Sequence, residues 1–106
     1  MPTVTITFDP AKREWTLQER AIDFLDAVQV FEGRTIDVED MRRDYGETRI
    51  QTIGFLAGRM VMVVWTPRDS AGRPAANVPD SVRHVISMRK CNDGEQAGYR
   101  DRLKGA

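Results

Sequence analysis

The sequence predicts an α+β fold, in which a small antiparallel sheet of about four to five strands is combined with two N-terminal helices and one C-terminal helix. Two kinds of pattern predict it. Polar and apolar residues alternate with a period of two in several segments, as in strands with one buried face. In other segments apolar residues recur at helical spacing after a helix-capping residue. A length of 106 residues is that of one domain, so we expect residues 1–106 to form a single domain.

The N-terminal segment is predicted to be a strand followed by a helix. Residues 3–8 alternate threonine with apolar residues. Asp9-Pro10 is a helix start, because aspartate caps free N–H groups and proline is tolerated in the first turn. The helix is predicted to end near Arg20. The side chains expected to be buried are Val4, Ile6 and Phe8 of the strand and Ala11, Trp15 and Ala21 of the helix.

A second helix is predicted between Asp23, its N-cap, and Gly33, its stop. Its apolar residues follow the spacing i, i+3, i+4 and i+7, which places them on one helical face. They are Phe24, Ala27, Val28 and Phe31.

The second half of the chain is predicted to form most of the sheet. Residues 35–38 form a short strand, and a polar loop follows over 39–46. Residues 47–56 and 59–66 are two strands joined by the tight turn Ala57-Gly58. Because residues 60–65 are almost all apolar, we expect the second of these strands to be central and covered on both faces.

The C-terminal part is predicted to be a loop, a strand and a helix. The loop spans 67–80, and the strand 81–88. Strict alternation in this strand places His84 in phase with its apolar residues, so the imidazole is expected to face the core. Asn92 followed by Glu95 is a capping box, which predicts a last helix to about Lys104.

Overall charge argues against a nucleic-acid partner, but its distribution does not. Sixteen Lys and Arg balance sixteen Asp and Glu, whereas residues 1–47 have a net charge of −5 and residues 48–106 of +5. Thirteen of the cations are arginine, the side chain best suited to forked contacts with phosphate. Any contact with RNA is therefore expected to be local, through a few placed arginines.

Several classes of protein are excluded by composition. A single cysteine, Cys91, excludes a disulfide framework and a thiolate metal cluster, and we read it as a structural thiol. No glycine-rich phosphate loop, membrane-length apolar run or signal peptide is present, so a cytoplasmic protein is expected. The acidic segment 37–44 matches no calcium loop and is interpreted as a solvated loop. We expect no cofactor and no metal ion.

Arginines in the strands are the candidate functional residues. Arg49, Arg68, Arg83 and Arg89 lie in or at the ends of three consecutive predicted strands, near Trp65. Cations interleaved with an aromatic ring are typical of surfaces that bind single-stranded RNA. The alternative is an ordinary soluble surface on which these arginines pair with carboxylates.

The chain resembles the BrnT family, toxins of bacterial type II toxin–antitoxin pairs with a fold similar to RelE-like ribonucleases. Five blocks match in order over nearly the whole chain. They are Phe8-Asp9-Pro10-Ala11-Lys12, then Asp23-Phe24-Leu25-Asp26-Ala27, then Gly46-Glu47-Thr48-Arg49 with Ile53-Gly54, then Val63-Val64-Trp65-Thr66-Pro67-Arg68, and last Arg83 to Arg89 with Lys90, Glu95 and Tyr99. The family's N-x-x-K-H-G pattern reads Thr16-Leu17-Gln18-Glu19-Arg20-Ala21 here, so Arg20 replaces its histidine.

The resemblance implies RNA cleavage without a metal ion, in which the 2′-hydroxyl attacks the adjacent phosphorus. Such chemistry needs a proton acceptor, a proton donor and cations around the phosphorane. The residues implied as catalytic are Glu47, Arg49, Arg68, Arg83 and Arg89. Those implied to bind substrate are Lys12, Arg20, Trp65, Ser87 and Lys90.

The resemblance also implies a partner, a small BrnA-like antitoxin with a ribbon–helix–helix domain that binds operator DNA; the toxin would reach that DNA only through the antitoxin. No membrane association is expected. Because the family's histidine is absent and the last helix is altered, a second hypothesis remains open. In it the chain is a catalytically weakened binding module that acts only with its antitoxin in operon repression.

Overall fold

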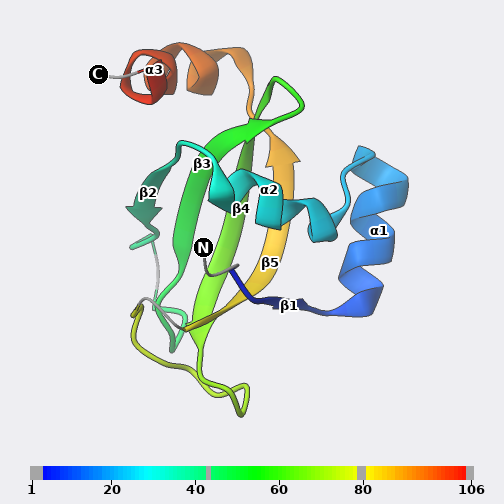
Figure 1. Ribbon diagram of the computed structural model, residues 1–106, viewed down its shortest axis with the longest axis vertical. Helices are drawn as coiled ribbons and strands as arrows, with labels where there is room; N and C mark the ends of the chain where they lie inside the picture. Colours follow the sequence, from blue (N-terminus) through cyan, green and yellow to red (C-terminus); the bar gives the residue numbers. More distant parts are fainter. Residues whose placement is uncertain (1–3, 43, 79–80, 105–106) are drawn as a thin grey trace.

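The computed structural model describes residues 4–42, 44–78 and 81–104. Five strands form one sheet in the order β1-β5-β4-β3-β2, and helices lie against it (Figure 1). The strands are β1 (Ile6–Phe8), β2 (Ile36–Glu39), β3 (Ile50–Leu56), β4 (Arg59–Arg68) and β5 (Val82–Lys90). The helical segments are α1 (Pro10–Arg20), the 3₁₀ turn η1 (Phe24–Asp26), α2 (Ala27–Glu32) and α3 (Asp93–Lys104). The α+β fold with two N-terminal helices and one C-terminal helix is confirmed. Two predicted boundaries, Thr3 and Asp80, lie outside the described residues.

The sheet is mixed rather than wholly antiparallel. β2 to β5 pair antiparallel, as predicted, but β1 adds to the edge of β5 in parallel, with Ile6 opposite Arg83. Residue alternation reports which side chains share a face, not the direction of the neighbouring strand. The long connection between β1 and β5 permits the parallel direction, whereas a short hairpin would make the two strands antiparallel.

The helix starts lie where the capping residues predict them. The carboxylate of Asp9 accepts a hydrogen bond from the Ala11 N–H, and Asn92 and Glu95 exchange the two bonds of a capping box. The buried face of α1 was predicted wrongly, because Ala11, Trp15 and Ala21 are exposed. The helix instead rests on Thr16 and on an ion pair between Arg13 and Asp23 (2.7 Å). An ion pair and one small side chain replace the expected apolar stripe.

Apolar clusters cover both faces of β4, as its composition predicts. On the helix side, η1 and α2 pack over Trp65, Val63 and their neighbours, and Phe31 meets the Trp65 ring edge-on. On the opposite side, Leu103 of α3 packs with Met60 and Met62. Figure 1 shows α3 at the end of the sheet where the β3–β4 turn lies. The other end of that face, where β4 finishes and β5 begins, lies away from α3.

A β-bulge in β5 changes which side chains face the core. Val64 pairs with Ser87 and Trp65 with Val85, so Ile86 is an extra residue without a partner. Val85 and Met88 both reach the helix-side core, although strict alternation would place them on opposite faces. His84 lies across from Thr66 on the other face, and the prediction that it faces the core is wrong.

Candidate functional site

The bulged strand separates the four candidate arginines. Arg83 lies on the helix side, with its guanidinium carbon 4.5 Å from the centre of the Phe31 ring and 4.3 Å from that of Trp65. Trp65 is completely buried and donates its indole N–H to Thr52 Oγ1 (2.7 Å). The expectation of one shared surface is therefore wrong for Arg83, and Trp65 has no exposed face on which a base could stack.

A second group of polar residues lies at the end of the sheet away from α3. Glu47 and Arg49 precede β3, Thr66 and Arg68 end β4, and His84 lies opposite Thr66 in β5. We call these five residues the strand-end cluster. Its centre is the Glu47 carboxylate, whose Oε2 lies 3.3 Å from Arg68 Nη2 and whose Oε1 lies 3.9 Å from Arg49 Nε.

The loop before β3 holds Arg49 in place. The Arg49 guanidinium carbon lies 4.0 Å from the centre of the Tyr45 ring, a cation–π contact. The Tyr45 hydroxyl donates to the buried carboxylate of Asp40, which also accepts three hydrogen bonds from Arg42. These contacts lower the pKa of Asp40 well below its usual range, so it is ionised at any physiological pH. The prediction of a solvated acidic loop is wrong for Asp40, which organises this segment.

Three buried polar atoms of the strand-end cluster have no hydrogen-bond partner among the residues that the structure describes. They are Arg49 Nε, Arg68 Nε and Thr66 Oγ1. An unsatisfied buried donor costs about 1–3 kcal/mol, which is rarely retained without a use. The three atoms themselves are closed to solvent, but the Arg49 and Arg68 side chains are 29% and 26% exposed. Their guanidinium groups can therefore meet an anion with several acceptor oxygens, such as a phosphate group.

His84 lies beside these groups and is half-buried. Its Nδ1 lies 2.8 Å from Thr7 Oγ1. Burial lowers the pKa of the imidazole below its usual 6.5, and the positive charges of Arg68 and Lys12 lower it further, against the opposing effect of Glu47. The ring is therefore neutral at neutral pH and can accept a proton.

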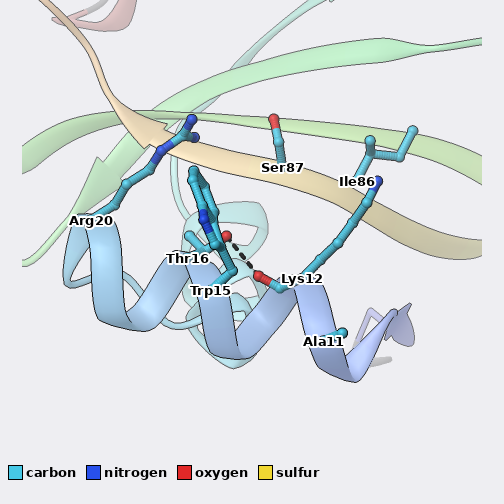
Figure 2. A pocket seen from close by; sticks show the side chains of 7 residues that line it. All are labelled: Ala11, Lys12, Trp15, Thr16, Arg20, Ile86 and Ser87. Atoms are coloured by element: carbon cyan, nitrogen blue, oxygen red, sulfur yellow. Dashed lines mark hydrogen bonds between the residues drawn. The ribbon is translucent and has the colours of Figure 1, made fainter.

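A groove between α1 and β5 brings together three of the residues implied to bind substrate, namely Lys12, Arg20 and Ser87 (Figure 2). It has a volume of about 450 Å³, and its remaining lining residues are Ala11, Trp15, Thr16 and Ile86. Trp15 is 53% exposed. Sequence reasoning placed this ring in the core, although its helical neighbours Lys12 and Glu19 are polar and indicate a solvent-facing position.

Arg89 and Lys90 take no part in either site. Both outer nitrogens of Arg89 bind the Glu95 carboxylate, each at 2.7 Å, and this guanidinium lowers the pKa of Glu95 to about 2. Arg89 thus fastens α3 to the sheet. Lys90 is exposed and pairs with Val61, whose side chain belongs to the helix-side core, so Lys90 lies on the face away from the strand-end cluster.

The described residues include no group of three or more His, Cys, Asp or Glu side chains placed to bind a metal ion. Burial raises the pKa of the Cys91 thiol, which lies in the apolar cluster beneath α3. In the part of the chain that the structure describes, no helix has the length and apolar character needed to cross a membrane.

The chain matches a known protein family. Residues 8–95 match the family described as "Ribonuclease toxin, BrnT, of type II toxin-antitoxin system". A search of curated proteins found no match. The matched range includes the strand-end cluster and every residue that lines the α1–β5 groove.

Proposed function

The chain belongs to the BrnT family of ribonuclease toxins of type II toxin–antitoxin systems, whose toxins have an antitoxin as partner, and we propose that it cleaves mRNA at the strand-end cluster without a metal ion. The 2′-hydroxyl of one nucleotide attacks the adjacent phosphorus. The bond from phosphorus to the 5′-oxygen of the next nucleotide breaks, and this oxygen takes up a proton from water. The products are a 2′,3′-cyclic phosphate and a free 5′-hydroxyl.

The observation on which the proposal depends is the pair of partly exposed guanidinium groups of Arg49 and Arg68, which lie 3.9 and 3.3 Å from the Glu47 carboxylate. The phosphorane carries more negative charge than the ground-state phosphodiester, so donors already fixed around it stabilise the transition state more than the substrate. Arg49 is fixed by the Tyr45 ring and Arg68 by Glu47, so little reorganisation is needed when the RNA binds.

His84 is the proposed general base. In the tautomer that donates Nδ1–H to Thr7 Oγ1, the Nε2 atom is free to take the proton of the 2′-hydroxyl. Its lowered pKa keeps it in the neutral form that this step requires. Glu47 then acts as a positioning residue, since its carboxylate orients the two arginines. Arg83 and Trp65 have no place in the proposed site, because they lie on the other face of the sheet.

We further propose that the partner is a small BrnA-like antitoxin with a ribbon–helix–helix domain, and that operator DNA is reached only through it. The toxin is proposed to act in the cytoplasm as a single domain of residues 1–106. The acidic groups of such an antitoxin would compete with RNA phosphates for the arginines of the strand-end cluster.

The test is cleavage of a defined RNA in EDTA by the purified chain. We expect products that end in a 2′,3′-cyclic phosphate, with activity lost in Arg68→Ala and Arg49→Ala. Arg100→Ala, an exposed arginine of α3, is the matched control and should retain full activity. Intact RNA with the wild-type protein, free of antitoxin, would falsify the proposal.

A second candidate function is the binding module without nuclease activity. Arg20 favours it, because Nη1 of this residue donates to the carbonyl of Met88 (2.9 Å). A guanidinium in that position cannot exchange a proton as the family's histidine could. This function predicts tight antitoxin binding together with unchanged cell growth and uncleaved RNA when the chain is expressed alone.

A further inference from the structure

Trp15 is a large aromatic side chain that belongs to neither of the two apolar clusters described above. It is 53% exposed, and it stands in the groove between α1 and β5 rather than in an apolar cluster. Figure 2 shows the indole between Arg20 and Lys12, with β5 forming the opposite wall. Burying an exposed tryptophan is strongly favourable, so a ring left open beside a groove is well suited to a ligand.

The groove is cationic, and β5 contributes both to it, through Ile86 and Ser87, and to the strand-end cluster, through His84. The guanidinium carbon of Arg20 lies 5.1 Å from the centre of the Trp15 ring, and Lys12 lines the groove on the same helix. The charge of Lys12 is felt at His84, which places this end of the groove next to the proposed base. None of the seven lining residues is acidic.

We infer that the Trp15 indole is a stacking platform for one nucleobase of single-stranded RNA, with the flanking phosphates on Lys12 and Arg20. The inference rests on the proposed function, since it names how the same substrate is held next to the reacting phosphate. A flat ring with cations nearby is the arrangement by which proteins hold unpaired bases. A groove of about 450 Å³ falls within the usual range of small-ligand sites, roughly 300–1,000 Å³.

RNA is favoured over a segment of the antitoxin as occupant. An apolar helix or strand of a partner would need a wider apolar surface than one indole and Ile86 provide. The two cations, by contrast, suit the negative charge of a nucleic-acid backbone. The Ser87 hydroxyl lines the groove and can form a hydrogen bond with the edge of the stacked base.

The experiment measures binding without cleavage. The probe is a single-stranded RNA oligonucleotide with 2′-O-methyl groups, which lacks the attacking hydroxyl, and binding is followed by fluorescence anisotropy. We expect Trp15→Ala to weaken binding roughly 5- to 160-fold, the effect of removing one base–aromatic stack. Trp15→Phe should retain most of the affinity. Leu17→Ala removes a neighbouring exposed side chain outside the groove and should bind like the wild type.

A second measurement needs no variant. The wild-type chain is titrated with the same oligonucleotide in which the bases are replaced by abasic sites, so that the phosphates remain and stacking is lost. An equal affinity for both oligonucleotides would overturn the inference, as would an unchanged affinity in Trp15→Ala. Loss of antitoxin binding in Trp15→Ala, with RNA binding intact, would assign the groove to the antitoxin instead.

The two proposals fail in different ways. Cleavage of RNA that does not depend on Trp15 overturns the stacking platform and leaves the nuclease function in place. Trp15-dependent binding of the methylated RNA without cleavage of ordinary RNA supports the platform and rejects the nuclease function.

Discussion

Replacing Glu47 by glutamine removes the one negative charge of the strand-end cluster and keeps the shape of the side chain. Glu47 is only 14% exposed, and Arg68, 3.3 Å away, is 26% exposed. Removing one partner of a fully buried ion pair costs about 3–5 kcal/mol. Because solvent screens this pair in part, we expect Glu47→Gln to lower the free energy of unfolding by about 2 kcal/mol. For a domain of this size, that change lowers the melting temperature by about 8–15 °C.

The same change should strengthen anion binding, since the two guanidinium groups no longer share a carboxylate. Any ligand that binds the folded state alone stabilises it, by an amount that grows as its dissociation constant falls. We therefore expect sulfate to raise the melting temperature of Glu47→Gln more than that of the wild type. Sulfate also stabilises proteins in general, so Glu19→Gln, an exposed glutamate of α1, is the control.

The assay is thermal unfolding followed by circular dichroism, with and without sodium sulfate, for the three proteins. Two results together would refute the interpretation of the cluster as an anion site held by one carboxylate. Glu47→Gln would have the melting temperature of the wild type, and sulfate would raise that temperature no more than it raises that of Glu19→Gln.

Three further predictions concern pH and packing. The pKa of His84 is lowered from 6.5, so the acidic limb of the pH–rate profile should have its midpoint below pH 6.5. Because His84 is the proposed base, His84→Gln should lower the cleavage rate and remove this limb from the activity that is left. The pKa of Glu95 is lowered from 4.5 to about 2, so its bond to Arg89 contributes stability that is full above pH 4.5 and is lost as pH falls toward 2. Glu95→Gln should therefore flatten the acid side of a plot of melting temperature against pH, and an unchanged slope would contradict this. A Cβ at Gly54 would come within 2.9 Å of a side chain of α2, so Gly54→Ala should cost about 1–3 kcal/mol in chemical denaturation, whereas Gly33→Ala, with its nearest contact at 3.7 Å, should cost less.

The fold could be predicted from local signals because most of its elements obey them. Asp9 and Asn92 cap the helices that they were expected to cap, and the turn at Ala57-Gly58 joins β3 to β4. Asp23 caps only the 3₁₀ turn η1, and the α-helix predicted to follow it begins later, at Ala27. The helix caps and the turn each depend on a few residues that are neighbours in the sequence, so they can be predicted from the sequence alone. The direction of β1 depends on a strand about 75 residues away in the chain, and alternation contains no information about it.

The site was predicted less well, because it depends on which face each residue takes. Glu47, Arg49 and Arg68 come together as expected, but Arg83 is turned to the other face and His84 joins the cluster instead. One unpaired residue, Ile86, is responsible for this exchange. The position of Trp15 has a different cause, since an ion pair between Arg13 and Asp23 anchors α1 and leaves its aromatic residue free.

The bulge at Ile86 sets the face of every residue that precedes it in β5. Deleting this one residue would give a regular ladder in which Val85 still pairs with Trp65 and Ser87 with Val64, so the other residues would keep their faces. Regular pairing with Ile86 retained would instead reverse the first half of the strand, so that Val85 would turn to solvent and His84 would enter the helix-side core. A relative with the same residues but no bulge at this position would therefore present its polar groups on the opposite face. An alignment of such relatives has to match faces as well as letters before any residue of this strand is given the same role.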